Sequence, residues 1–459
     1  MKKINLFKIF VISTFCALSS CSKDIAIETQ VGTSGSKMPV KASSYAASYS
    51  ASSWMGLLSD NSSLAKITIP GTHDACARVE PIAGTAKCQN LSLTDQFNAG
   101  VRFVDIRCRH INNAFAIHHG QVYQNMNFDD VLNATIAFLN SNPSECIIMS
   151  IKEEYNASNN TRSFEATLDT YIAKNPGKWN LGATIPSLGN VRGKIVLLRR
   201  FGTGNTKGID ASNWSDNTTF SINNSNANLR VQDYYNVSGT DAKWTSVSNL
   251  LNEAAAGNYE TMYLNFTSGV KSFIGIPSIT TVSNAINPKV NDFFNANTSG
   301  RYGIIIMDFA DATKCTRIIN TNVPITSGIY SIISKQSGLV MDDPNFSTIE
   351  GTNIIVYNNV GSINQKWAFT PTGGGYYSII NQKSNLAIDG GANIQTTLLQ
   401  QWTSNFTQDQ LWRVKPTLDG YSLISQQTGL AIDGAANASD VKIQLWGANA
   451  TPNQIWFIQ

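Results

Sequence analysis

The stretch Ile304-Ile305-Ile306-Met307-Asp308 places a carboxylate directly after four apolar residues. Similar short apolar runs recur through the first 320 residues, and several are apolar on both faces, which is typical of parallel strands covered by helices. The strand candidates are 66–69, 101–107, 115–118, 147–151, 194–198, 262–266 and 303–307. Residues 129–140 carry apolar side chains at helical spacing. This alternation predicts an α/β fold of the (βα) barrel type.

Polar side chains follow these apolar runs at one end. His73 comes just after the first run, and Lys152, Arg200 and Asp308 come after later ones. In the run 101–107, the polar residues Asp105 and Arg107 are two positions apart, so they share a face. The carboxyl ends of parallel barrel strands form the rim of an active site. One Arg–Asp pair alone would favour a structural role. Polar residues at the same end of five strands favour an active site.

Histidine is rare in this chain, which has only four. Three of them fall in two motifs, Ile69-Pro70-Gly71-Thr72-His73-Asp74 and His118-His119-Gly120. Histidine titrates near neutral pH, so one ring can begin neutral while another begins protonated. An arginine beside them can stabilise developing negative charge. Two histidines, an arginine and supporting carboxylates therefore predict a site that cleaves phosphodiesters and needs no metal or other cofactor.

Residues 1–20 are typical of a secretory leader. Lysines precede the largely apolar stretch 6–18, which is too short to span a membrane comfortably. Leu18-Ser19-Ser20-Cys21 then resembles a bacterial lipobox, which predicts lipidation of Cys21. Residues 21–52 are rich in Ser and Ala and predict a flexible tether. We expect an exported, membrane-anchored lipoprotein, and a secreted protein cut near residue 20 is the alternative.

The composition limits the partners. The formal net charge is +3, and the leader supplies three lysines and no acid, so the rest of the chain is close to neutral. This balance argues against nucleic acid and against a polybasic membrane surface. Of the five cysteines beyond the leader and Cys21, Cys76 and Cys88 both follow His73 in one loop and are the favoured disulfide in an oxidising compartment. The other three could be buried thiols, and connectivity cannot be read from spacing.

The last third of the chain is a threefold repeat. Similar apolar starts at residues 328, 376 and 421 lead to Gln-Lys-Trp367, Gln-Leu-Trp412 and Gln-Ile-Trp456. The closing tryptophans are 45 and 44 residues apart. Three strand-rich units of this length predict a closed, pseudo-threefold all-β domain. Because 459 residues also exceed one ordinary core, we expect two domains.

The first region resembles bacterial phosphatidylinositol-specific phospholipase C. The resemblance runs in consistent order over most of residues 54–320. It includes the motifs around His73, Arg107, His119 and Asp308, together with 142–145, 147–152, 193–198, 231–233 and 264–267. It implies a distorted TIM barrel and cleavage of phosphatidylinositol to diacylglycerol and inositol 1,2-cyclic phosphate. A departure is that residues 78–93 contain no tryptophan for membrane contact, which leaves Phe273 and Ile274 as alternatives.

The resemblance also implies roles for individual residues. His73 would be the general base, oriented by Asp308. His119 would be the general acid, assisted by Asp74. The remaining implied residues would bind the substrate. Arg107, braced by Asp105, would hold the phosphate. Lys152, Arg200 and Asp233 would bind the inositol hydroxyls, and Tyr235 would pack on the inositol ring. His118 and His110 have no expected role.

The second region, about 327–459, resembles a ricin B-type β-trefoil lectin. This family binds sugar through an Asp, a Gln two before a stacking aromatic, and an Asn beside the closing Gln. Repeat 3 is complete and predicts a carbohydrate site of Asp433, Gln444, Trp446, Asn453 and Gln454. Repeat 2 has Asp389, Gln400, Trp402 and Gln410, with Asp409 in place of the Asn. Repeat 1 is the weakest, because Ile355 replaces the Gln. A trefoil that binds no sugar is the alternative.

These expectations combine into one hypothesis and two alternatives. The hypothesis is a monomeric phosphatidylinositol phosphodiesterase that acts on phosphatidylinositol or glycosylphosphatidylinositol (GPI) lipids at a membrane surface. Its barrel would span 53–322, and its lectin, which binds glycans, 327–459. One alternative is a glycan-binding surface lipoprotein with a catalytically silent barrel. The other is a metal-dependent glycerophosphodiesterase with the same fold.

Overall fold

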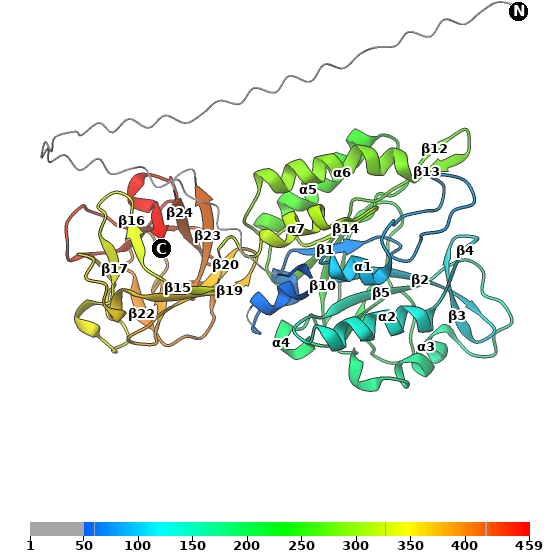
Figure 1. The fold of residues 1–459 in the computed structure, drawn as a ribbon, viewed down its shortest axis with the longest axis horizontal. Helices are drawn as coiled ribbons and strands as arrows, with labels where there is room; N and C mark the ends of the chain where they lie inside the picture. Colours follow the sequence, from blue (N-terminus) through cyan, green and yellow to red (C-terminus); the bar gives the residue numbers. More distant parts are fainter. Residues whose placement is uncertain (1–49, 59, 326, 418–419) are drawn as a thin grey trace, which may run out of the picture. The chain divides into compact units, whose positions relative to one another are not determined.

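A computed structural model describes residues 50–58, 60–325, 327–417 and 420–459. The predicted leader, Cys21 and nearly all of the predicted tether lie outside these ranges. Within them, the region up to residue 325 alternates strands with helices, and the region after it consists of short strands (Figure 1). None of the helices in the described residues combines the length and apolar character needed to cross a membrane.

The first region is built on one largely parallel sheet. Its strand order is β6-β7-β5-β2-β1-β14-β11-β10-β9, and only the last pair on this path is antiparallel. The strands are β1 (Ile69–Thr72), β2 (Phe103–Ile111), β5 (Ile147–Glu153), β6 (Trp179–Asn180), β7 (Ile195–Arg199), β9 (Thr219–Asn223), β10 (Asn228–Gln232), β11 (Thr261–Phe266) and β14 (Ile304–Met307). The connecting helices are α1 (Leu93–Asn98), α2 (Phe128–Ser141), α3 (Phe164–Ile172), α4 (Leu188–Val191), α5 (Thr240–Ala256), α6 (Ile279–Ala296) and α7 (Ala312–Asn320).

The central strands are buried on both faces, as the sequence predicts. Every residue of β7 and of β14 is buried. Val and Ile suit such strands because their branched side chains pack on a pleated surface. The hydrophobic core of this region extends from Trp54 to Val323. The predicted distorted TIM barrel is confirmed.

One predicted strand is wrong in its bounds, and another is confirmed as a strand but pairs antiparallel with its neighbours. Residues 64–66 form a short 3-10 helix, η2 (Leu64–Lys66), and β1 begins only at Ile69. The run 115–118 lies in β3 (Ala114–His119), which pairs antiparallel with β2 and with β4 (Val122–Asn127). β3 pairs antiparallel with β2 because a tight turn at Asn112 and Asn113, which have φ of 52° and 56°, joins the two strands. Two successive residues with positive φ match the twist of a β-hairpin, and Asn tolerates that conformation.

The second region is an all-β unit, and the expected β-trefoil fold is confirmed. Trp367, Trp412 and Trp456 are fully buried. Their indole nitrogens donate hydrogen bonds to the carbonyls of Met341, Ile388 and Ile432, at 3.1, 3.0 and 3.1 Å. The strands are β15 (Gly328–Tyr330), β16 (Ile332–Ser334), β17 (Val340–Asp342), β18 (Ile355–Tyr357), β19 (Trp367–Gly373), β20 (Tyr376–Asn381), β21 (Ala387–Asp389), β22 (Gln400–Trp402), β23 (Leu411–Thr417), β24 (Gly420–Ser425), β25 (Ala431–Asp433), β26 (Val441–Lys442), β27 (Gln444–Trp446) and β28 (Trp456–Ile458).

Candidate active site

Strand register brings His73 and Asp308 together. β1 and β14 are parallel, and Thr72 pairs with Met307. The next residue of each strand therefore lies at the same level at the carboxyl end of the sheet. The buried side chain of Gln89 fixes both strand ends, because its amide nitrogen donates to the carbonyls of His73 and Met307 at 2.9 and 2.8 Å.

Both ring nitrogens of His73 have a partner. Nδ1 lies 2.8 Å from Asp308 Oδ1, and Nε2 lies 2.8 Å from Arg107 Nη2. Guanidinium nitrogens can only donate, so Nε2 carries the lone pair and Nδ1 carries the proton that Asp308 accepts. Burial acts to lower the pKa of His73, but the Asp308 carboxylate outweighs it and the pKa lies above its usual value. The ring is thus held in the tautomer that a general base requires.

Asp105 joins two arginines beneath the site. Arg107 Nε donates to Asp105 Oδ2 at 3.2 Å, and Arg200 Nη1 lies 3.6 Å from Asp105 Oδ1. Burial acts to raise the pKa of Asp105, but the two guanidinium groups hold it well below the usual range. The carboxylate therefore stays charged and braces both arginines, whereas the sequence predicted only its contact with Arg107.

His119 faces His73 from the end of β3. The two ring centroids are 6.5 Å apart, and the rings are nearly perpendicular. His119 Nδ1 donates to the carbonyl of Ala86 at 2.6 Å, which leaves Nε2 directed toward Asp74 Oδ2 at 3.9 Å. Burial raises the pKa of Asp74. The structure thus brings the predicted acid pair close together, but beyond direct hydrogen-bond distance.

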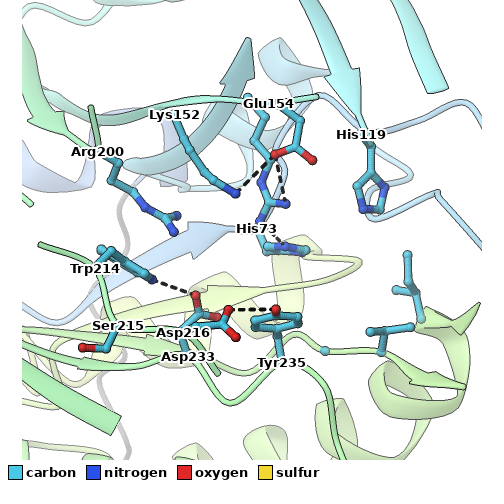
Figure 2. Close-up of a pocket in the computed structure, with 14 residues that line it drawn as sticks. His73, His119, Lys152, Glu154, Arg200, Trp214, Ser215, Asp216, Asp233 and Tyr235 are labelled. Atoms are coloured by element: carbon cyan, nitrogen blue, oxygen red, sulfur yellow. Dashed lines mark hydrogen bonds and ion pairs between the residues drawn. The ribbon is translucent and has the colours of Figure 1, made fainter. Parts of the chain in front are cut away.

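These groups open onto a cavity of about 460 Å³ (Figure 2). All four predicted inositol-binding residues line it: Lys152, Arg200, Asp233 and Tyr235. Figure 2 shows Lys152 and Arg200 on one side of His73, with Asp233 and Tyr235 on the other. Inositol bound in the cavity would therefore meet the cations of Lys152 and Arg200 on one side and the side chains of Asp233 and Tyr235 on the other.

Several residues of this cavity were not predicted from the sequence, among them Trp214, Asp216 and Glu154. Trp214 Nε1 donates to Asp233 Oδ2 at 3.0 Å, and the Arg200 guanidinium carbon lies 3.6 Å from the centroid of the Trp214 ring. Asp216 accepts a hydrogen bond from the Tyr235 hydroxyl at 2.9 Å. The third, Glu154, lies 3.3 Å from Lys152 Nζ and 3.9 Å from an Arg107 nitrogen. Trp214 and Asp216 lie in a stretch without periodicity, whereas Glu154 lies two residues beyond Lys152, a spacing that could have indicated it.

The predicted disulfide is wrong. Cys76 and Cys88 are both free and buried. Cys76 packs in the main core of the barrel, whereas Cys88 belongs to a small separate cluster with Ala77 and Ile279. The Cys88 sulfur instead lies 4.0 Å from His119 Nδ1. The two cysteines share one loop in the sequence but pack into different hydrophobic clusters.

The remaining two histidines point elsewhere, as expected. His118 is buried between Tyr123 and Tyr155, with ring centroids at 5.6 and 6.2 Å. His110 is buried, and its Nε2 lies 2.9 Å from the Thr167 hydroxyl. The alternation of a β-strand explains why His118 and His119 face opposite sides.

In the second region, the residues predicted to bind sugar gather around buried aspartates. In repeat 3, Asp433 accepts from Asn453 at 2.7 Å and from Gln454 at 3.1 Å. It also pairs across the sheet with Gln444, and Trp446 lies two residues further on, partly exposed.

Repeat 2 has the same arrangement. Asp389 accepts from Gln400 and Gln410 at 3.1 and 3.0 Å, with Trp402 exposed nearby in sequence. Each predicted set is therefore brought together.

Comparisons with known proteins agree with this geometry. Residues 76–201 match the model of the phosphatidylinositol-specific phospholipase C X domain. Residues 319–402 and 363–446 match the model of the ricin-type beta-trefoil lectin domain-like family. Two similar curated proteins are called 1-phosphatidylinositol phosphodiesterase. The one from Staphylococcus aureus (strain Newman) is 36% identical over 283 residues, which is 58% of this chain and 90% of that protein. The one from Listeria monocytogenes is 31% identical over 284 residues, 59% of this chain and 84% of that protein.

Solved structures agree as well. A double mutant of the S. aureus phosphatidylinositol-specific phospholipase C gives a TM-score of 0.54 at 34% identity, covering 60% of this chain and 97% of that one. The L. monocytogenes enzyme gives 0.51 at 28% identity, covering 60% and 99%. Barrel, site and relatives lead to one conclusion: the chain belongs to the phosphatidylinositol-specific phospholipase C family.

Proposed function

We propose that this protein is a phosphatidylinositol phosphodiesterase, a phosphorus–oxygen lyase. It cleaves phosphatidylinositol to diacylglycerol and inositol 1,2-cyclic phosphate. The observation that carries the proposal is the convergence of His73, His119 and Arg107 on one cavity, with Arg107 donating to His73 Nε2 at 2.8 Å. Few reactions other than phosphodiester cleavage need two proton-transfer groups and a guanidinium at one point.

The first half of the reaction assigns His73 as the general base. Its Nε2 would take the proton of the inositol 2-hydroxyl, while Asp308 accepts from Nδ1 and stabilises the imidazolium that forms. The hydroxyl oxygen then attacks the phosphorus of the neighbouring phosphate, a ring closure favoured by proximity. Arg107, braced by Asp105, would hold the phosphate oxygens and offset their developing charge. No metal is assigned a step, because Arg107 supplies this charge.

The second half assigns His119 as the general acid. As the phosphorus–oxygen bond to diacylglycerol breaks, His119 Nε2 would give its proton to the leaving oxygen. The buried Asp74 carboxylate, whose Oδ2 lies 3.9 Å from Nε2, would orient the ring for this transfer. Lys152, Arg200 and Asp233 would bind inositol hydroxyls, and Tyr235 would pack on the ring. These contacts favour an inositol headgroup over a headgroup with fewer hydroxyls.

We further propose that residues 53–322 form the catalytic domain and that residues 327–459 form a carbohydrate-binding module. Buried aspartates with amide partners beside partly exposed tryptophans in repeats 2 and 3 support this, because flat aromatic rings stack on apolar sugar faces. A lectin beside this barrel would direct the enzyme to glycan-bearing lipids such as GPI anchors. Export with lipidation at Cys21 would hold it at the cell envelope, and release into the medium is the alternative.

The test is to incubate the purified mature protein with phosphatidylinositol micelles in excess EDTA and to follow products by phosphorus NMR. We expect cyclic inositol phosphate from the wild type and none from His73→Ala or His119→Ala. His118→Ala is the matched control, because its ring is buried away from the cavity. Activity only with added calcium would instead identify a metal-dependent enzyme. No product under either condition would favour the silent-barrel alternative.

A further inference from the structure

A thiol lies between the two histidines of the site, and the acid–base scheme does not use it. Cys88 is fully buried. Its backbone is fixed, since its N–H donates to the Ala77 carbonyl at 2.9 Å and its own carbonyl accepts from Phe309 N at 2.7 Å. Possible metal-ligand atoms of Asp74, Cys88 and His119 all lie within 4.8 Å of one another. The same holds for His73, Cys88 and Asp308.

The two clusters of possible ligands differ in whether their histidine has a ring nitrogen available for a metal. His73 is engaged at both ring nitrogens, by Asp308 and by Arg107. His119, in contrast, donates from Nδ1 to the Ala86 carbonyl, and its Nε2 lies 3.9 Å from the Asp74 carboxylate. The Cys88 sulfur lies 4.0 Å from Nδ1 of the same ring.

Asp74 is the second observation that points to a ligand. It is fully buried, and neither of its carboxylate oxygens has a hydrogen-bond partner among the residues that the structure describes. Its nearest cation is Arg107, whose Nε lies 3.7 Å from Oδ2. A buried carboxylate without a hydrogen bond is costly and is usually compensated by a cation.

We propose that Asp74, Cys88 and His119 form a binding site for a thiophilic divalent cation, best Zn²⁺, and that the bound cation inhibits the enzyme. Thiolate, imidazole and carboxylate are the ligands that zinc prefers, whereas Ca²⁺ and Mg²⁺ prefer oxygen alone. Zinc bonds of about 2.0–2.3 Å need the three ligand atoms closer together than they lie here. Binding therefore requires the Cys88 and His119 side chains to rotate so that the sulfur and Nε2 point to the same ion. On binding, the Cys88 thiol releases its proton to the buffer and the sulfur bonds the metal.

Inhibition follows from the identity of the ligands and rests on the proposed function. A cation on His119 takes the lone pair that must carry the proton of the general acid. It also occupies the Asp74 carboxylate that faces Nε2. The protein would then respond to free zinc through a residue that the reaction itself does not need.

Metal binding is tested first without activity, by adding Co²⁺ to the whole mature protein and recording its absorption spectrum. We expect a sulfur-to-cobalt charge-transfer band that Zn²⁺ removes. Cys88→Ser should lose the band, whereas Cys315→Ser, which removes another buried thiol, should keep it. Asp74→Asn should weaken binding at least about tenfold, because even outer-shell ligand partners contribute that much. Thermal unfolding by circular dichroism checks that each variant folds.

Inhibition is tested next, with the phosphatidylinositol assay and each variant normalised to its own rate in EDTA. We expect Zn²⁺ to inhibit the wild type and Cys315→Ser alike, and Cys88→Ser to need at least about tenfold more. Excess EDTA should restore the wild-type rate. A cobalt spectrum without a sulfur band, or equal inhibition of wild type and Cys88→Ser, would overturn the proposal. If no variant cleaves lipid, the proposed function fails while the cobalt spectrum still decides on the site.

Discussion

His73 Nε2 accepts a hydrogen bond from Arg107 Nη2 across 2.8 Å, so the lone pair of the assigned base is held by the group assigned to phosphate. When the substrate phosphate binds the Arg107 guanidinium, it would replace His73 as the acceptor. The Nε2 lone pair would then be free to take the proton of the inositol 2-hydroxyl. Base activation would thus be coupled to substrate binding. The other ring nitrogen is held by Asp308, and this carboxylate raises the pKa of the base against the lowering effect of burial.

Asp308→Asn tests this control of the base. Burial acts to lower the pKa of His73 and the Asp308 carboxylate raises it, so the amide should let the pKa fall. Catalysis needs neutral His73, and therefore the acidic limb of the pH–rate profile should move to lower pH. The plateau rate should fall about 100-fold, in the range of general-base contributions. Asp292→Asn, at an exposed position of α6, is the control. An acidic limb that stays in place would contradict the assignment.

The sequence predicts those site residues that follow a strand, because strand register fixes their positions, and it does not predict those that lie in loops. His73 and Asp308 are predictable because each follows an apolar strand, and parallel strand ends meet at one edge. Trp214 is not predictable, because its contacts with Arg200 and Asp233 arise between a loop and two strand ends far apart in the chain. Cys88 was misassigned for the same reason: loop residues lack the periodicity that fixes which side a residue faces.

Trp214→Phe should weaken substrate binding more than turnover. The phenyl ring keeps an aromatic face for Arg200 but loses the N–H that orients the Asp233 carboxylate at 3.0 Å. A hydrogen bond to a charged group contributes about 1.5–3 kcal/mol, so KM for phosphatidylinositol should rise about tenfold or more. Trp244→Phe, on α5, serves as the control. If kcat carries the loss and KM does not change, Trp214 acts on the chemistry and not on inositol binding.

Ile274 and Ile276 should contact the lipid surface. They lie on the hairpin of β12 (Lys271–Phe273) and β13 (Ile276–Ser278), with exposures of 104% and 59%. Cavity-lining Val270 and Ile279 directly precede and follow this hairpin, so it rises from the rim of the site. Burying an isoleucine is worth about 1.5–3 kcal/mol, so each change to Ser should weaken vesicle binding about tenfold or more.

Sedimentation with phosphatidylinositol-containing vesicles measures this effect. Ile349→Ser, an exposed residue of the second region, is the control. The rate on a water-soluble inositol phosphodiester should not change, because the hairpin adds membrane contact only. Unchanged vesicle binding in the double variant would show that another surface meets the bilayer.

Trp446→Ala should reduce glycan binding, whereas Tyr357→Ala should not. Repeat 3 has the full set of polar partners around Asp433, while repeat 1 has Ile355 where the predicted site needs Gln. Both aromatics are at least partly exposed, so neither change opens a core cavity. Binding to a panel of immobilised glycans provides the measurement. Equal loss in both variants, or no binding by the wild type, would favour a trefoil that only spaces the barrel.

Lys243 should make stability depend on pH in the alkaline range. Its side chain is fully buried on α5, and Nζ donates to the carbonyls of Tyr234 and Phe266 at 2.8 and 2.6 Å. One acceptor, Tyr234, lies between the cavity residues Asp233 and Tyr235 in the sequence. Burial lowers its pKa from 10.5 to about 7. The unfolded chain therefore binds one more proton than the folded chain between these two values, and the free energy of unfolding gains with rising pH across that window.

Lys243→Met removes this contribution and takes the Lys243 donor from the Tyr234 carbonyl, at a cost of about 1–3 kcal/mol for a buried group left unsatisfied. The Phe266 carbonyl keeps its hydrogen bond from Gln232 Nε2 at 2.8 Å. Whether the variant is more or less stable than the wild type at a single pH depends on how that cost compares with the cost of the buried charge. The diagnostic quantity is therefore the slope of the free energy of unfolding against pH. Urea unfolding of both proteins at several pH values from about 7 to 10 should show the wild type gaining stability relative to the variant. Lys271→Met, on the β12 hairpin, is the comparison that should follow the wild type. Parallel curves for wild type and Lys243→Met would mean that Lys243 keeps its charge when the protein is folded, with its hydrogen bonds compensating for burial.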